Sequence, residues 1–173
     1  MLPTRRICAL LISTLASGAL FADGGYGAGL QTSIDVGLKG AIVPRLDYLH
    51  TSDSDTVSGV SLSTHSDIVA VGADYDYFLG ADPDHGCYVL GGAGVAFANI
   101  EVSGSAEGMS ASTRSHQTLL YPEVGVGYLF NRHIGVEVLY KDLNFSDVTL
   151  VVDNIPTGYS FSGGLQAALV VRF

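Results

Sequence analysis

The segment YSFSGGLQAALVVRF, from Tyr159 to Phe173, decides the fold. Apolar side chains occupy every second position from residue 159 onward except at Gly163: Tyr159, Phe161, Leu165, Ala167, Leu169, Val171 and Phe173. The positions between them are polar or small, among them Ser160, Ser162, Gln166 and Arg172. Successive side chains of a β-strand point to opposite faces, so the pattern predicts one strand with an apolar face and a polar face. Such a strand spans roughly 45–50 Å, enough to cross a bilayer at a tilt.

The same alternation recurs upstream and predicts six further strands, at residues 29–39, 42–50, 67–79, 87–103, 119–130 and 134–141. Within 87–103, glycines and alanines blur the pattern, and the larger side chains favour an outward-facing set of Tyr88, Leu90, Ile100 and Val102. Beyond Asp142 the alternation breaks, which indicates a bulge or a strand leaving the membrane.

The connections are predicted to alternate in length. Short turns are expected at residues 39–41, 80–86 and 131–132. Polar loops rich in Ser, Thr, Asp or Gly are expected at 51–64, 104–115 and about 152–158. Outer-membrane barrels have short periplasmic turns and longer extracellular loops, so this alternation favours a barrel with Phe173 on the periplasmic side.

The strand count departs from the expected pattern. Bacterial single-chain barrels have an even number of strands, whereas seven are recognisable here. With Phe173 in the periplasm, the strand at 29–39 descends, so an ascending strand is missing before Gly29, and residues 23–28 are too few to form it. A misassigned start, a lost strand or one strand that is really two would each explain this, and we expect an eight-stranded design with an irregular first hairpin.

The amino terminus, residues 1–22, is predicted to be a secretory signal peptide, with Arg5 and Arg6 ahead of an apolar stretch from Ile7 to Leu15. Cleavage is expected after Ala22 or, alternatively, after Ala19. The barrel domain is then predicted to cover residues 23–173. Removing two arginines from the 8 Lys and Arg leaves 6 against 17 Asp and Glu, a net charge of −11, which argues against nucleic-acid binding. Cys8 leaves with the signal, so Cys87 has no partner for an intrachain disulfide.

Composition agrees with an all-β membrane protein. The chain has 22 Gly, no Trp and only 14% charged residues, yet its mean hydropathy is positive. After the amino terminus no stretch reaches the roughly 18 consecutive apolar residues of a membrane helix. Alternating strands hide their apolar surface from such a window. The fold class predicted is therefore an antiparallel up-and-down transmembrane β-barrel of about eight strands.

The alternating strands, the terminal Val170-Val171-Arg172-Phe173 and strand ends such as Gly125-Val126-Gly127-Tyr128 resemble the small bacterial outer-membrane β-barrels of the OmpA/OmpX type, as a barrel domain alone. The resemblance covers about residues 24–173. It implies an outer-membrane location in a Gram-negative bacterium, outer-membrane lipid as the surroundings, and recognition of the C-terminal strand and Phe173 by the outer-membrane assembly machinery. It names no extracellular partner.

The inward-facing positions carry a predicted polar network. Its members are Asp35, Arg45, Asp47, Asp74, Asp76, Glu123, Glu137, Lys141 and Arg172, with Gln31 and Gln166 on the same face. An eight-stranded barrel is narrow enough to be filled by its own side chains, so we interpret the network as a structural plug of ion pairs. The alternative is a path for protons or small ions. Acids outnumber bases, so some carboxyl groups should face water or hold a proton.

Aromatic residues are predicted to form two membrane-interface belts: Tyr77, Tyr88, Tyr128, Phe130 and Phe173 near the short turns, and Tyr48, Tyr140, Tyr159 and Phe161 near the loops. No catalytic residue, cofactor or metal site is predicted. In His65-Ser66-Asp67, adjacent side chains point to opposite faces, so histidine and serine could not act as base and nucleophile. The remaining histidines show no metal-ligand spacing.

Three functional hypotheses follow. The leading one is a non-enzymatic outer-membrane protein with a structural or surface-interaction role, in which acidic loops face the exterior. The second is a narrow pore or carrier for small solutes. The third, disfavoured, is a lipid-modifying barrel enzyme, because no nucleophile and base were found on one face.

Overall fold

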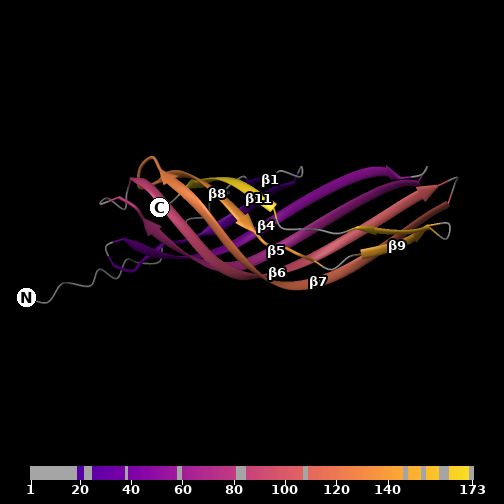
Figure 1. Cartoon of the computed structure of the whole chain (residues 1–173), viewed down its shortest axis with the longest axis horizontal. Helices are drawn as coiled ribbons and strands as arrows, with labels where there is room; N and C mark the ends of the chain where they lie inside the picture. The colour runs from indigo at the N-terminus through magenta and orange to yellow at the C-terminus, as the bar shows by residue number, and fades with distance from the viewer. Residues whose placement is uncertain are drawn as a thin grey trace, which may run out of the picture.

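The computed structural model describes residues 19–21, 25–37, 39–57, 60–80, 85–106, 109–145, 148–152, 155–159 and 164–171. The strands of this part, shown in Figure 1, are β1 (Ala19–Phe21), β2 (Tyr26–Gln31), β3 (Ile34–Asp35), β4 (Gly40–Val57), β5 (Val60–Phe78), β6 (Gly86–Ala106), β7 (Met109–Leu129), β8 (Ile134–Lys141), β9 (Val148–Val152), β10 (Ile155–Tyr159) and β11 (Gly164–Val171). No helix among these residues is long and apolar enough to cross a membrane.

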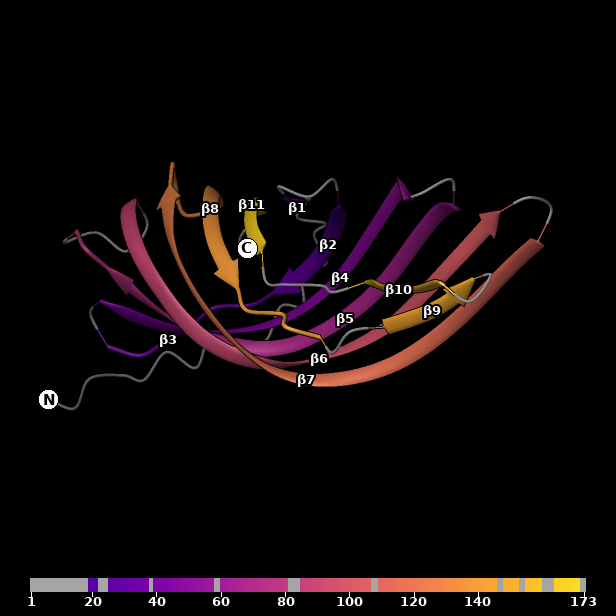
Figure 2. The same ribbon diagram turned by 45° about the vertical axis from the view of Figure 1, so that its right-hand side comes forward.

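The strands form one antiparallel up-and-down sheet in the order β2-β1-β11-β8-β7-β6-β5-β4-β3, and β2 also pairs with β4. That last pairing closes the ladder into a ring of eight strands, in which β2 and β3 together fill one position along β4. The fold class predicted from the alternation is confirmed. The four strands β4 to β7 are far longer than the others and sweep beyond them as a curved half-barrel (Figure 2).

The outer surface of the ring carries an apolar band. On β5, for example, Val69, Val71, Tyr75 and Tyr77 are exposed, while the even-numbered residues between them are buried or half-buried. The same holds on β7 and β8, where Val124, Val126, Val136 and Val138 are exposed. Exposed apolar side chains on a period of two are what a lipid-facing barrel surface requires.

Two predicted loops are strands instead. β4 and β5 continue in unbroken register up to the pair Val57↔Val60, and β6 and β7 up to Ala106↔Met109. The predictions of loops at 51–64 and 104–115 were therefore wrong, apart from the tip residues outside the described part. These loops were predicted because Ser, Thr and Asp are typical of loops. The same residues also occur in a solvated strand whose backbone groups pair with neighbouring strands. We call the end with these two long hairpins the hairpin end, and the opposite end the turn end.

The predicted facing of β6 was also wrong. Tyr88, Leu90, Ile100 and Val102 are buried in the interior, and Val89 and Phe97 face outward. Tyr88 consequently does not join the predicted aromatic belt. Glycines at some interior positions of the neighbouring strands leave space that large side chains of β6 fill. One such space is at Gly127, directly across from Tyr88, where a Cβ would collide with the tyrosine ring.

The missing ascending strand is supplied by β1. Ala19–Phe21 pairs with Gln166–Ala168 of β11 on one side, and Ala19 and Leu20 pair with Gly27 and Tyr26 of β2 on the other. This segment lies within residues 1–22, the predicted signal peptide. Cleavage after Ala22 would remove all of β1, and cleavage after Ala19 would leave Leu20 and Phe21.

Among the described residues the final strand, β11, covers Gly164–Val171, and Tyr159, predicted to begin that strand, belongs to the separate β9–β10 hairpin. Arg172 and Phe173 lie outside the described residues, as do Phe161 and most of residues 1–22. The predicted break after Asp142 is observed, because β8 ends at Lys141 and the following Leu143 and Phe145 turn into the interior.

Removal of β1 is expected to weaken ring closure. A chain beginning at Asp23 leaves Gln166–Ala168 of β11 with backbone groups that have no partner on one side, which is costly in a lipid environment. Refolded into detergent micelles, it should lose its folded gel mobility at a lower temperature than the full-length chain. Equal transition temperatures would show that β1 contributes nothing to closure.

Candidate functional site

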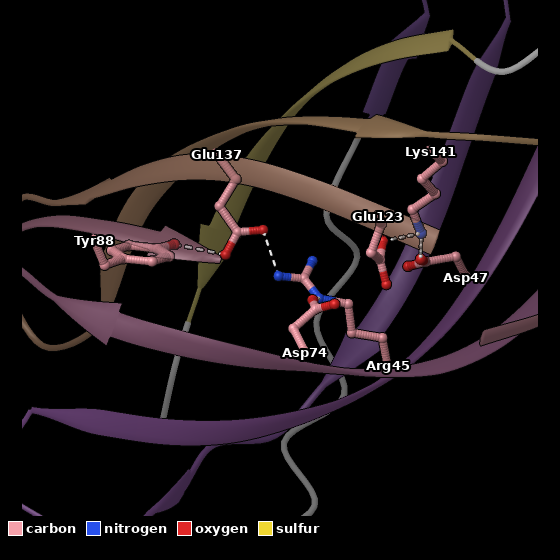
Figure 3. Close-up of polar contacts among 7 residues, drawn as sticks. All are labelled: Arg45, Asp47, Asp74, Tyr88, Glu123, Glu137 and Lys141. Carbon is pink, nitrogen blue, oxygen red and sulfur yellow. Dashed lines mark hydrogen bonds and ion pairs between the residues drawn. The ribbon is translucent and has the colours of Figure 1, made fainter. Parts of the chain in front are cut away.

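Arg45 organises one half of a buried polar layer inside the ring. Its Nη2 donates to Glu137 Oε2 across the interior at 2.8 Å, and its Nε pairs with Asp74 of β5. Tyr88 donates its hydroxyl to the other oxygen of Glu137, at 2.6 Å. Figure 3 shows Asp74 and Glu137 on the guanidinium of Arg45 and Tyr88 on Glu137; the four side chains come from β4, β5, β6 and β8. The planar fork of arginine suits it to hold two carboxylates at once.

Lys141 organises the other half. Its ammonium pairs with Asp47 of β4, lies 3.3 Å from Glu123 Oε2 of β7, and sits 5.4 Å from the centre of the Tyr121 ring (Figure 3). Lysine is a compact point charge with three donors, so it can serve several acceptors at once. Arg45, Asp47, Asp74, Glu123, Glu137 and Lys141 are called the polar layer below.

The polar layer is almost completely removed from solvent. The side chains of Asp74, Glu123 and Glu137 are 0% exposed, and that of Lys141 is 1% exposed. Asp76 is buried beside it, so the described interior holds five carboxyl groups against Arg45 and Lys141. Burying an uncompensated charge is very costly, so the carboxyl groups in excess of the two cations need compensation from other polar groups.

Apolar clusters lie on both sides of the polar layer along the barrel axis. At the turn end the cluster comprises Ala41, Val43, Phe78, Tyr88, Leu90, Leu129 and Leu139. At the hairpin end it comprises Leu49, Ile68, Ala70, Ala96, Ala98, Ile100, Val102, Tyr121, Leu143 and Phe145. The interior therefore contains two apolar clusters in addition to the polar network that was predicted from the sequence. Buried apolar side chains pack densely, so both ends of the polar layer are covered.

The structure brings together most of the predicted network residues. Asp35 is exposed on β3, away from the polar layer, because β3 lies at the turn end. Gln166 is buried and Gln31 half-buried, while Arg172 is outside the described residues. Sequence reasoning missed Tyr88 and Tyr121 as partners of the ions. Tyr121 stands two residues before Glu123, so its position on the charged face of the strand was a usable signal.

A second polar group lies outside, just above the apolar band. Tyr48 donates to Asp67 Oδ1 at 2.6 Å, and His50 Nδ1 lies 2.8 Å from the same oxygen. The hydrogen bond from Tyr48, followed by that from His50, holds the pKa of the Asp67 carboxyl below its ordinary value. Its side chain remains 45% exposed, so the stabilisation is modest.

A serine and a histidine do share a face, at Ser63 and His65, a pair that the sequence analysis overlooked. Ser63 Oγ lies 3.5 Å from His65 Nδ1. The cross-strand neighbour of His65 is Glu101, whose carboxylate accepts a hydrogen bond from Arg114 at 2.6 Å. That carboxylate is bound by Arg114, and a hydrogen bond between it and the imidazole is not among the described contacts. The described residues contain no group of three or more His, Cys, Asp or Glu placed to hold a metal ion.

Comparisons with known proteins bear on the fold alone. No protein-family model and no curated protein sequence matches the chain. Among solved structures, the N-terminal β-barrel domain of Pseudomonas aeruginosa OprF is similar, with 18% identity over 89% of both chains and a TM-score of 0.52. Ail of Yersinia pestis has 12% identity over 89% of this chain and 91% of its own, with a TM-score of 0.50. Neisserial surface protein A has 16% identity over 91% and 92%, with a TM-score of 0.50.

These neighbours are small outer-membrane β-barrels of eight strands. Together with the closed ladder and the exposed apolar band, they establish that the chain has the fold of a small outer-membrane β-barrel of the OmpA/OmpX type. At these identities the likeness shows no shared activity.

Replacing Arg45 by methionine should be strongly destabilising. The substitution leaves Asp74 and Glu137 buried without their cation, and breaking a buried pair in this way costs about 3–5 kcal/mol. Arg114→Met is the matched control, because the Arg114–Glu101 pair is exposed and should contribute little. Urea unfolding in detergent or lipid vesicles measures both. Equal effects of the two substitutions would contradict the buried role of Arg45.

Tyr48→Phe should raise the pKa of Asp67 towards its ordinary value. Because this pKa is lowered in the folded state, the ionised carboxylate stabilises the fold above about pH 4, and that contribution disappears as the pH falls through the folded-state pKa. A carbon-13 NMR titration of Asp67 in micelles follows the change, with Tyr77→Phe as control. An unchanged Asp67 titration in Tyr48→Phe would rule out the hydrogen bond as the main cause.

Proposed function

We propose that the protein is a non-enzymatic outer-membrane barrel that presents its long-hairpin sheet to an external partner. One observation carries this proposal: β4 to β7 continue beyond the shorter strands as an ordered sheet, while the interior beneath them is closed by packed side chains. An extended outer sheet above a closed interior fits a surface role better than a transport role. In this proposal the chain reaches the outer membrane through a signal cleaved after Ala19, which leaves Leu20 and Phe21 of β1 in place, and is inserted by the assembly machinery through its C-terminal strand.

The closed interior argues against transport in physical terms. A solute would have to displace the apolar cluster at the hairpin end, separate the ion pairs of Arg45 and Lys141, and then displace the cluster at the turn end. Each step loses buried contacts, and the middle step leaves charges without partners. The same groups hold β4, β5, β7 and β8 together across the interior, which is a structural task.

A narrow pore is the second candidate, and the excess of interior acids favours it. Five carboxyl groups against two cations could attract protons or small cations if the apolar clusters opened. Conductance across a planar bilayer distinguishes the two functions. The purified protein should give no current steps beyond those of protein-free membranes, and Arg45→Met should add none if the apolar clusters close the interior. Reproducible steps from the unmodified protein would establish the pore.

The surface role requires the hairpin end to face outward. An epitope inserted between residues 58 and 59 should bind antibody on intact cells, because it lies at the tip of the β4–β5 hairpin. An epitope between Asn131 and Arg132, in the tight turn closed by the Phe130 N–H to Ile134 carbonyl bond, should bind only after permeabilisation. The reverse pattern would overturn the proposed orientation. Reduced gel mobility on boiling serves as the check that each insertion variant is folded.

A further inference from the structure

Two carboxyl groups of the polar layer meet across β6. Asp74 on β5 and Glu123 on β7 are both register partners of Gly92 on β6, and both side chains are buried in the interior. Neighbouring strands lie about 4.8 Å apart, so backbones two strands apart are separated by about 10 Å. The side chains can meet because Gly92 has none, and a Cβ there would collide with the Asp74 carboxylate. The two carboxyl groups lie within hydrogen-bond reach of each other (Figure 3).

No described donor lies between these two groups. Neither oxygen of Glu123 accepts a hydrogen bond from a described residue, and the Lys141 ammonium, 3.3 Å from Oε2, donates to Asp47. Both oxygens of Asp74 are buried as well, and their described partner is the Arg45 guanidinium, as an ion pair. Ionised carboxylates only accept hydrogen bonds, so two of them in contact repel each other.

The surroundings do not remove this repulsion. The charged and titratable groups of the described interior around the pair are Arg45 and Asp47 from β4, Asp76 from β5, Tyr88 from β6, Tyr121 from β7, and Glu137 and Lys141 from β8. Five carboxyl groups therefore stand against two cations, in a space closed by apolar clusters at both ends. The buried Tyr121 hydroxyl has no hydrogen-bond partner among the described residues.

A proton is the group that fits this arrangement. One proton between two carboxyl groups in contact removes one negative charge and turns their repulsion into a hydrogen bond. A hard metal cation instead requires six or so oxygen ligands, roughly, around one point. The described residues contain no set of three or more acidic, His or Cys side chains arranged in that way.

We propose that Asp74 and Glu123 share one proton, as a carboxylic acid that donates to a carboxylate, and that this bond makes the stability of the barrel wall sensitive to pH. The bond joins β5 to β7 across Gly92. Loss of the proton leaves two carboxylates in contact in a buried site, which destabilises the fold. The inference concerns the interior and is independent of the proposed surface role.

The sign of the pH dependence follows from the number of bound protons. Separate carboxyl groups of the unfolded chain have pKa values of about 4 and are ionised at neutral pH, whereas the folded pair keeps one proton. The folded state therefore binds more protons, and its stability falls as the pH rises above about 5. As long as the folded pair keeps the proton, the equilibrium constant of unfolding should rise about tenfold for each pH unit.

Urea unfolding in lipid vesicles between about pH 5 and pH 9 measures this slope, below the range in which tyrosine and lysine titrate. Glu123→Gln places an amide donor permanently against Asp74, so it should lose about a tenfold change per pH unit relative to the unmodified protein. Glu101→Gln is the matched control, because Glu101 is exposed and should leave the slope unchanged. Histidines titrate in this range in all three proteins, so their contribution cancels in the comparison.

Infrared spectroscopy detects the proton directly and does not require any variant to fold. In micelles of a detergent without ester groups, the unmodified protein should show the carbonyl stretch of a protonated carboxyl group at neutral pH. Glu123→Gln and Asp74→Asn should each remove this band, and Glu101→Gln should keep it.

Three outcomes would overturn the proposal. One is the absence of the band from the unmodified protein. Another is an equal pH slope in Glu123→Gln and the unmodified protein, which would place any proton elsewhere. The third is a stabilisation by Na⁺ over N-methylglucamine at equal ionic strength without the infrared band, which would assign a bound metal cation to the site.

Discussion

The requirement that every backbone polar group in a bilayer be paired within the protein constrains this structure more than any other. Eight antiparallel strands meet it by forming a ladder that returns on itself through the β2–β4 and β1–β11 pairings. Only three residues of β1 complete the ring. Where the requirement ends, above the apolar band, β8, β11, β1 and β2 also end, and β4 to β7 continue alone because water can satisfy their outer edges.

The closed ring then creates a narrow interior that must be filled. Apolar side chains fill its two ends, and the polar layer fills the middle. Arg45 and Lys141 each hold two carboxylates. One comes from the strand next to their own, and the other comes from a strand on the opposite side of the interior. Ion pairs of this kind give little net stability relative to apolar packing, but they fix which side chains can meet. The cross-interior contacts between β4 and β8 therefore help to specify register and closure.

Alternation in the sequence was sufficient to predict the barrel, the lipid-facing residues of β5, β7 and β8, and the interior position of the residues in the polar layer. The alternation gave wrong predictions where successive side chains do not differ in polarity. In β6 the run Gly91-Gly92-Ala93-Gly94 does not indicate which face of the strand is buried. The large side chain of Tyr88 was predicted to face the lipid, but it points inward, where Gly127 leaves space for its ring. The long hairpins were missed because hydroxyl-rich strands and loops share a composition, and only pairing with a neighbour separates them. The partners within the polar layer could not be predicted either, because register between distant strands decides them.

The fold alone does not determine the function, since barrels of this type host different roles and the similar solved structures share less than a fifth of their residues with this chain. What is particular to the molecule lies in two places. One is the interior, where the charged groups are enclosed by apolar side chains and support the wall. The other is the extended sheet, in which β4 to β7 stay paired in continuous register through segments rich in Ser and Thr. Because pairing with neighbouring strands satisfies the backbone of these segments, the sheet stays ordered above the packed interior.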